Sequence, residues 1–117
     1  METTIYHLVI PEWWENFADK DYYESEMLHE EKFIHLSTAE QVNNTLTNYF
    51  KGVERVLLLH VDTSKLTSEL IFEDIFGIGI QFPHLYGRLN KDAVTLVETL
   101  PATSNWTNIS RDVARNV

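Results

Sequence analysis

The sequence predicts one small α+β domain, built on a mostly antiparallel or mixed sheet with two main helices. The chain has 117 residues, of which 44% are hydrophobic and 12% aromatic, and this suits a single core. Strand-like and helix-like segments are mixed without regular βαβ alternation, and no internal repeat interrupts them. We expect the domain to occupy residues 1–101. A polar tail follows over residues 102–117, either disordered or with a short helix from Thr107.

Proline marks the boundary between the first two elements. The stretch TIYHLVI, Thr4 to Ile10, is rich in β-branched and aromatic residues and stops at Pro11, which predicts a strand. Pro11 then opens a short helix, PEWWENFA, with acidic residues in its first turn and aromatic side chains on one side. In residues 19–32 the apolar residues recur at neither helical nor strand spacing. We expect a loop there, with one helical turn around Ser25 to Glu30.

The clearest helix signal follows a short predicted strand, Phe33 to Leu36. Ser37, with Glu40 three residues later, has the pattern of a capping box, in which two side chains satisfy free N–H groups at a helix N-terminus. Apolar residues then recur at helical spacing until Gly52 ends the run. We therefore expect a helix capped by Ser37.

The second half of the chain predicts three more strands. The continuous apolar run from Val56 to Leu59 is typical of a central strand buried on both faces. Glu69 to Ile75 is a further strand, and Ala93 to Leu100 is the last one. Between them, residues 76–87 hold three of the four glycines, so we expect an irregular connection with tight turns.

Composition excludes several classes of function. A formal net charge of −9 makes nucleic acid an unfavourable partner, because that affinity comes largely from Lys and Arg on phosphates. Up to Glu31 the chain has nine acidic residues against one basic residue, Lys20, which we interpret as a solvated acidic face. The absence of cysteine excludes disulfides and thiolate chemistry. No run approaches the roughly 20 apolar residues of a membrane span, and a signal-peptide pattern is lacking, so we expect a cytoplasmic protein with no membrane partner.

Histidine and hydroxyl side chains gather where the predicted strand meets the helix. By strand alternation, His35 shares a face with Phe33 and Ser37. A helix N-terminus offers unpaired N–H groups that suit a phosphate or a carboxylate. His35, Ser37 and Thr38 can therefore form half of a binding site. The alternative is that Ser37 only caps the helix and His35 only bonds a carbonyl.

A second candidate group lies further along the chain. The stretch QFPHLYG places His84 and Tyr86 in a loop, and loops on a rigid sheet commonly carry binding residues. A packed loop without function is an equal alternative. Glu73 lies within a predicted strand, where a carboxylate is costly to bury without a partner. It therefore lies either at an edge in water or in a functional pair.

Five motifs together carry a resemblance to a known family. They are IYHL from Ile5, FIHLST from Phe33, LLLHVD from Leu57, LIFE from Leu70 and FPHLYG from Phe82. With these motifs the chain resembles the bacterial family catalogued as domain of unknown function 952. The family usually has tryptophan before the glutamate, where this chain has Phe72. The family name implies no activity.

The order of IYHL, a loop, FIHLS and a helix is also similar to the tRNA 2′-phosphotransferase branch of the ADP-ribosyltransferase superfamily. This resemblance implies an ADP-ribosyltransferase-like fold with NAD as substrate. It implies that His7 contacts a ribose, that His35 and Ser37 line the nicotinamide side, and that Glu73 or His84 completes the catalytic set. A carboxylate in that set would stabilise the oxocarbenium-like charge as nicotinamide leaves. The branch relies on phosphate-holding arginines, whereas this chain has Lys32 before the strand, so we do not expect transfer to tRNA.

Three functions stay open from the sequence. The first is a small-molecule cleft that binds NAD or a related nucleotide, with or without turnover, lined by His7, His35, Ser37, Thr38, His84 and Tyr86. The second is a metal site of His35, His84 and Glu73, since two imidazoles and one carboxylate are a common ligand set. The third is a binding module without chemistry that recognises a metabolite or a protein.

Overall fold

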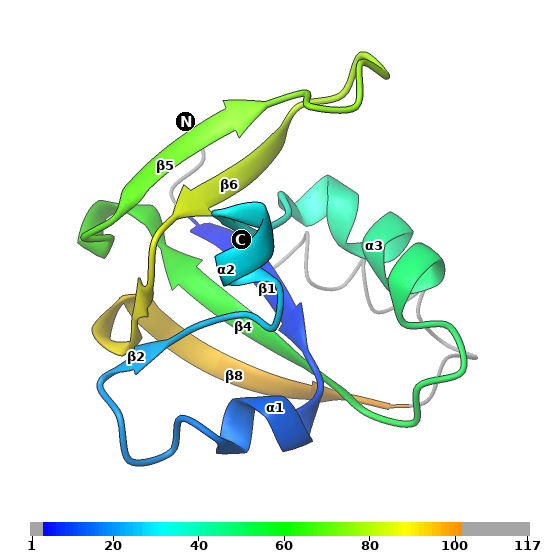
Figure 1. Ribbon diagram of the computed structural model, residues 1–117. Coiled ribbons are helices and arrows are strands. Elements are labelled where there is room, and N and C mark those ends of the chain that lie inside the picture. The colour runs from blue at the N-terminus through cyan, green and yellow to red at the C-terminus, as the bar shows by residue number, and fades with distance from the viewer. Residues whose placement is uncertain (1–3, 102–117) are drawn as a thin grey trace.

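Eight strands and three α-helices form within residues 4–101, the part of the chain that the computed structural model describes (Figure 1). In chain order they are β1 (Thr4–Val9), α1 (Pro11–Glu15), β2 (Tyr22–Tyr23), α2 (Leu28–Glu31), β3 (Ile34–His35), α3 (Val42–Tyr49), β4 (Val56–Asp62), β5 (Glu69–Glu73), β6 (Phe82–Tyr86), β7 (Leu89–Asn90) and β8 (Val94–Leu100). Every strand pair among these residues is antiparallel. The predicted α+β class with an antiparallel sheet is confirmed.

The expected tail, residues 102–117, lies outside the described residues, and so does its helix from Thr107. Within residues 4–101, the helices are all too short or too polar to cross a bilayer.

The central strand of the first sheet is β4, which pairs with β1 on one side and β8 on the other. Its side chains alternate between two cores, as the apolar run predicts. Leu57 and Leu59 face the core shared with the second sheet, whereas Val56 and Leu58 face the core covered by α3. Burial on both faces is therefore confirmed for Val56 to Leu59, and it explains why these four residues are all apolar.

The second sheet has the strand order β3-β6-β5 and corrects one sequence prediction. We expected residues 76–87 to be an irregular connection, but Phe82–Tyr86 is the central strand β6. Pro83 obscured this strand, because proline lacks the N–H of a normal ladder residue. Pro83 lies opposite Leu36, at the end of the ladder between β3 and β6, so the absent N–H interrupts no further pairing. The N–H of Leu36 still donates to the Pro83 carbonyl (2.9 Å). Only residues 74–81 connect β5 to β6, at the tip of the projecting hairpin in Figure 1.

A four-residue segment, residues 34–37, joins the two sheets. Ile34 and His35 pair with Leu85 and His84 of β6. Ser37 then forms both hydrogen bonds of an antiparallel bridge with Tyr6 of β1, at 2.8 and 2.7 Å between nitrogen and oxygen. We call residues 34–37 the linking segment. It fixes the position of β6 relative to β1.

A 3₁₀ turn, Ala39–Gln41, follows the linking segment and leads into α3, and its N-cap lies one residue later than predicted. This N-cap is Thr38, whose N–H donates to Oε1 of Gln41 (3.0 Å), so the predicted capping box of Ser37 and Glu40 is wrong. Ser37 does not form the capping box because its N–H is donated to Tyr6 of β1 and is not available to the side chain of Glu40. Its hydroxyl instead forms a hydrogen bond with the hydroxyl of Thr45 on α3 (3.0 Å).

Replacing Leu59 by alanine should lower the free energy of unfolding by about 2–5 kcal/mol, because this side chain is fully buried in the central strand. The matched control is Leu96→Ala on β8, where the side chain is half exposed and the loss should stay below about 1 kcal/mol. Urea denaturation at pH 7 measures both changes. Equal losses in the two variants would contradict the position of Leu59 in the core.

Candidate functional site

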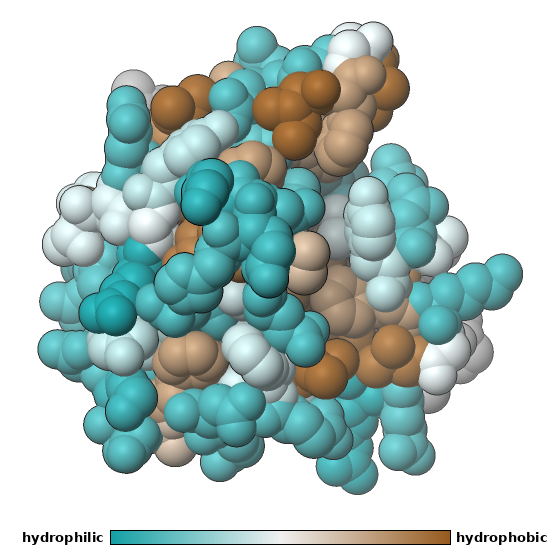
Figure 2. Space-filling model, in the orientation of Figure 1, coloured by the Kyte–Doolittle hydropathy of each residue, from teal (hydrophilic) through white to brown (hydrophobic). Residues whose placement is uncertain are grey.

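Two adjoining hollows, of about 340 and 350 Å³, lie between β1, the linking segment, α2 and α3. Figure 2 shows the surface hollowed between α2 and α3, with apolar residues in brown below the hollow. We call the two hollows together the cleft. The residues that line both are His7, Leu8, Met27, Glu31, His35, Tyr49 and Phe50. Such volumes are typical of small-molecule sites.

His7 of β1 is a buried polar side chain on the floor of the cleft, with 6% of its surface exposed. Its Nδ1 lies 2.7 Å from the backbone oxygen of His35, and its Nε2 lies 2.8 Å from the hydroxyl of Tyr23. Burial lowers the pKa of His7 from 6.5 to about 4. The ring is therefore neutral at pH 7.

The partners of His7 also fix its tautomer. A carbonyl oxygen can only accept, so the proton lies on Nδ1 and is donated to His35. Nε2 then accepts the hydroxyl proton of Tyr23. Burial raises the pKa of that phenol, and Glu26 raises it further, so the hydroxyl keeps its proton. The imidazole is thus held in one orientation from both ends.

His35 presents its side chain to solvent at the mouth of the cleft, with 45% of the side chain exposed. Its Nε2 lies 3.2 Å from Oε1 of Glu31, four residues earlier at the end of α2. The backbone carbonyl of the same residue is the acceptor for His7. His35 therefore holds the floor through its backbone and offers its ring to a ligand.

The two hydroxyl residues expected in the site have different surroundings. Ser37 is buried and lines the cleft, as does its partner Thr45. Thr38 does not line either hollow, and its N–H is taken by the side chain of Gln41. The helix N-terminus that we expected to bind an anion thus already has an internal acceptor.

The remaining predicted residues form a second network on one face of the β5–β6 hairpin. Oε2 of Glu73 accepts a hydrogen bond from Nδ1 of His84 (2.9 Å) and another from the hydroxyl of Tyr86. The bond from Tyr86, and then the bond from His84, hold the pKa of Glu73 below its usual value. The same carboxylate raises the pKa of Tyr86. Glu73 therefore lies at a sheet edge and is also paired.

The second network touches the cleft through ring contacts rather than hydrogen bonds. Phe33 stacks on His84 with ring centroids 4.1 Å apart, and His35 meets the edge of the same ring at 5.0 Å. His84 is 1% exposed, and its Nε2 has no hydrogen-bond partner among the described residues. Glu73, His84 and Tyr86 do not line either hollow. Of the six residues expected to line one cleft, His7, His35 and Ser37 line it, His84 and Tyr86 belong to the network behind it, and Thr38 belongs to neither.

The proposed metal site is not assembled. Across residues 4–101, no three histidine or carboxylate side chains come together in a way that could hold a metal ion. Glu73 bonds the Nδ1 of His84, and the carboxylate next to His35 is Glu31 instead.

Sequence reasoning missed several residues of the cleft. Tyr23 lies in a region predicted to be a loop, and nothing in the local pattern marks it as the partner of His7. Glu31 belongs to the acidic stretch that we interpreted as a solvated face, yet it lines both hollows. The aromatic side chains that complete the walls are Tyr49, Phe50, Phe76 and Phe82. Their positions relative to His7 depend on how the two sheets meet, which no local pattern shows.

Comparison with known proteins agrees with this arrangement of motifs. The family described as "Protein of unknown function (DUF952)" matches residues 8–97, most of the chain. The chain belongs to this family. No curated protein matches it significantly.

The chain is also similar to solved structures of a protein from Caulobacter crescentus. The crystal structure of protein CC0527 is 32% identical, with a TM-score of 0.78, and the match covers 87% of this chain and 90% of that one. The solution NMR structure of CC0527 is 31% identical, with a TM-score of 0.75, over 89% and 90% of the two chains. The descriptions of the family and of CC0527 name no activity. The resemblance to ADP-ribosyltransferases therefore stays a prediction.

The lowered pKa of His7 predicts a specific dependence of stability on pH. As pH falls from 6.5 towards about 4, the unfolded chain binds a proton at this residue and the folded chain does not, so folding loses up to about 3 kcal/mol. A His7→Asn variant, which can still donate to the His35 carbonyl, should lack this loss. The measurement is urea denaturation between pH 7.5 and 4, with exposed His29→Asn as the control. Parallel pH profiles for His7→Asn and the unmodified chain would contradict the buried neutral ring.

Replacing Tyr86 by phenylalanine should raise the pKa of Glu73, because the bond from Tyr86 is the larger cause of its low value. Carboxyl-carbon NMR of labelled protein, titrated from pH 7 to pH 2.5, measures this pKa. Tyr49→Phe removes a hydroxyl from a mostly exposed position and is the control. An unchanged pKa of Glu73 in Tyr86→Phe would show that this bond does not form in solution.

Proposed function

We propose that the cleft binds a nucleotide-like small molecule, with NAD as the leading candidate. The observation that carries this proposal is the combination of two imidazoles, from His7 and His35, with aromatic walls in a single hollow. A flat heterocycle can stack on such walls, and polar groups on the floor can fix its orientation.

The shape of the cleft supports a ligand with more than one part. The two hollows adjoin and share His7 and His35, so an elongated ligand can occupy both and pass over the two rings. Trp13 and Tyr23 line only one hollow, and Phe76 and Phe82 line only the other. A ring at one end joined through a sugar to a second group would use this length.

The chemistry that the superfamily resemblance implies is transfer of ADP-ribose from NAD. In that reaction the bond between the nicotinamide nitrogen and the ribose breaks, its electron pair leaves with nicotinamide, and a nearby carboxylate stabilises the positive ribose. An acceptor hydroxyl group or water then forms a bond to the same ribose carbon and loses its proton. His35 lines the cleft directly, whereas Glu73 and His84 lie behind it. The proposal therefore gives His35 a direct role and makes Glu73 and His84 positioning residues that support it.

A second candidate function is binding without turnover. It is favoured by the state of Glu73, because the carboxylate predicted to be catalytic already accepts bonds from His84 and Tyr86. A metabolite or a peptide side chain could occupy the same cleft in that case. The two functions differ in whether nicotinamide is released from bound NAD.

Proton–nitrogen NMR titration of labelled protein with NAD tests the proposal. We expect the amides of residues 33–40 and of Leu8, Glu31 and Tyr49 to shift at millimolar NAD or below. A chromatographic assay for released nicotinamide then shows whether the protein is an enzyme or a binding module. If none of these amides shifts at millimolar NAD, the proposed function is wrong.

A variant separates binding from packing. His35→Ala should weaken NAD binding about tenfold or more while the melting temperature changes by only a few degrees, because the ring is half exposed. His29→Ala, which removes an exposed imidazole outside the cleft, is the control and should leave both unchanged. A large fall in melting temperature for His35→Ala would instead show that this ring is needed for packing.

A further inference from the structure

We infer that the cleft selects a planar organic cation, such as the N-ribosylpyridinium end of NAD, and that a diphosphate attached to it stays outside. This inference rests on the proposed function and names the part of the ligand that the cleft holds. Three features of the described residues support it: the charge of the lining, its aromatic side chains, and the partners that nearby phosphate-binding groups already have.

The ionisable lining of the cleft is acidic. Glu31 lines both hollows and Glu26 lines one of them. No lysine or arginine within residues 4–101 lines either hollow. His7 adds no positive charge, because burial keeps its ring neutral at pH 7. Coulomb attraction to these carboxylates favours a cation over a phosphate.

Aromatic side chains line the hollow to which Glu31 also belongs. Tyr49, Phe50, Phe76 and Phe82 line the same hollow as Glu31. Tyr49 and Phe76 are 72% and 60% exposed, so their faces are available to a ligand. An aromatic face attracts a cation through its quadrupole, and a flat cationic ring also stacks on it. A carboxylate with several aromatic rings is therefore a suitable site for a pyridinium.

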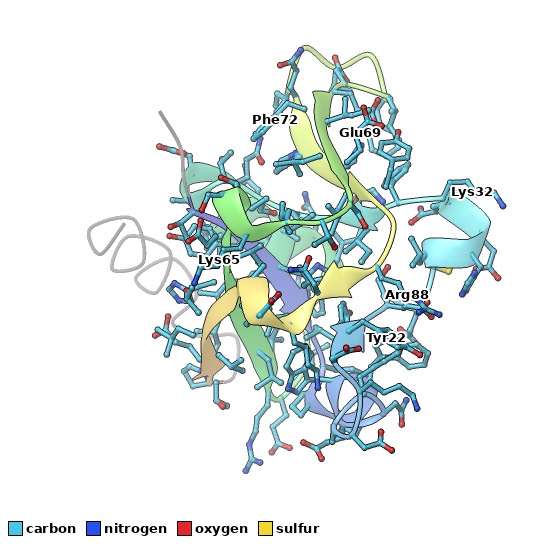
Figure 3. All side chains as sticks on the ribbon, turned by 90° about the vertical axis from the view of Figure 1, so that its left-hand side faces the viewer. Tyr22, Lys32, Lys65, Glu69, Phe72 and Arg88 are labelled. Atoms are coloured by element: carbon cyan, nitrogen blue, oxygen red, sulfur yellow. The ribbon has the colours of Figure 1, made fainter. Side chains whose placement is uncertain are left out.

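The groups that could hold a phosphate near this region already have partners. The N–H of Thr38 donates to Gln41. Arg88 donates to Glu24 (2.7 Å) and lies over the ring of Tyr22, as Figure 3 shows. Both groups are therefore already engaged, and no lysine or arginine of residues 4–101 lines the cleft. A diphosphate would thus gain little by entering and would meet Glu26 and Glu31.

The experiment compares three ligands that divide NAD into its parts. Nicotinamide riboside carries the cationic ring and the sugar, nicotinamide is the neutral ring, and ADP-ribose carries the diphosphate without the ring. Dissociation constants come from NMR titration at pH 7 and low salt, and the NAD titration is the reference. We expect nicotinamide riboside to bind about tenfold more tightly than ADP-ribose, and its affinity to fall as sodium chloride is added.

The matched variants are Glu31→Gln and Glu30→Gln, which remove the same charge from neighbouring positions of α2. Glu30 does not line either hollow. Glu31→Gln should weaken the binding of nicotinamide riboside by about fivefold to tenfold, because the cationic ring loses its attraction to the carboxylate. The affinity for neutral nicotinamide should stay nearly unchanged. Glu30→Gln should have little effect on either. Melting temperatures confirm that both variants fold.

The outcomes distinguish this inference from the proposed function. If ADP-ribose binds at least as tightly as nicotinamide riboside, or if Glu31→Gln has no more effect than Glu30→Gln, the inference is overturned while the nucleotide cleft stands. If NAD and all three fragments leave the cleft amides unmoved, the proposed function fails. Tighter binding of the cation that depends on Glu31 and weakens with salt supports both.

Discussion

The short linking segment, residues 34–37, is the constraint on which the rest of this structure depends. Its first residues pair with β6 and its last residue bridges to β1, so the two sheets share one stretch of backbone. Pro83 ends the ladder between β3 and β6, because proline has no N–H that could donate to Leu36 in return. The linking segment leaves β6 at the same point. The position of β1 relative to β6 follows from this exchange of partners.

The same segment fixes the floor of the cleft. The His35 carbonyl, within the segment, accepts the proton of His7 on β1, and this bond determines which ring nitrogen carries the proton. Tyr23 completes the arrangement from the opposite side. A buried imidazole with both nitrogens satisfied is rigid and neutral, which makes it a fixed polar surface for a ligand rather than a source of charge. The charge of the cleft therefore comes from its carboxylates.

Much of the fold could be predicted from local patterns, but less of the site could. The apolar run of β4 and the proline that opens α1 are local signals, and both elements form as expected. The capping box was assigned one residue early because Ser37 has the right spacing to Glu40, and only its pairing with β1 excludes it as a cap. The sequence does not predict strand β6 because it contains Pro83. A proline fits this strand only because it lies opposite the end of β3. In each case a partner distant in sequence decided the outcome.

The histidines of the sequence motifs have unequal roles because the sheet separates them. His35 and His84 face each other across β3 and β6, but one ring is half exposed and the other is buried under Phe33. Glu73 on β5 holds the buried ring of His84 in one orientation by a hydrogen bond. The ring of His84 in turn contacts the ring of His35 at the mouth of the cleft. Glu31 holds the exposed ring from the other side, on α2. The orientation of His35 thus depends on two carboxylates from separate elements, of which only Glu31 can meet a ligand directly.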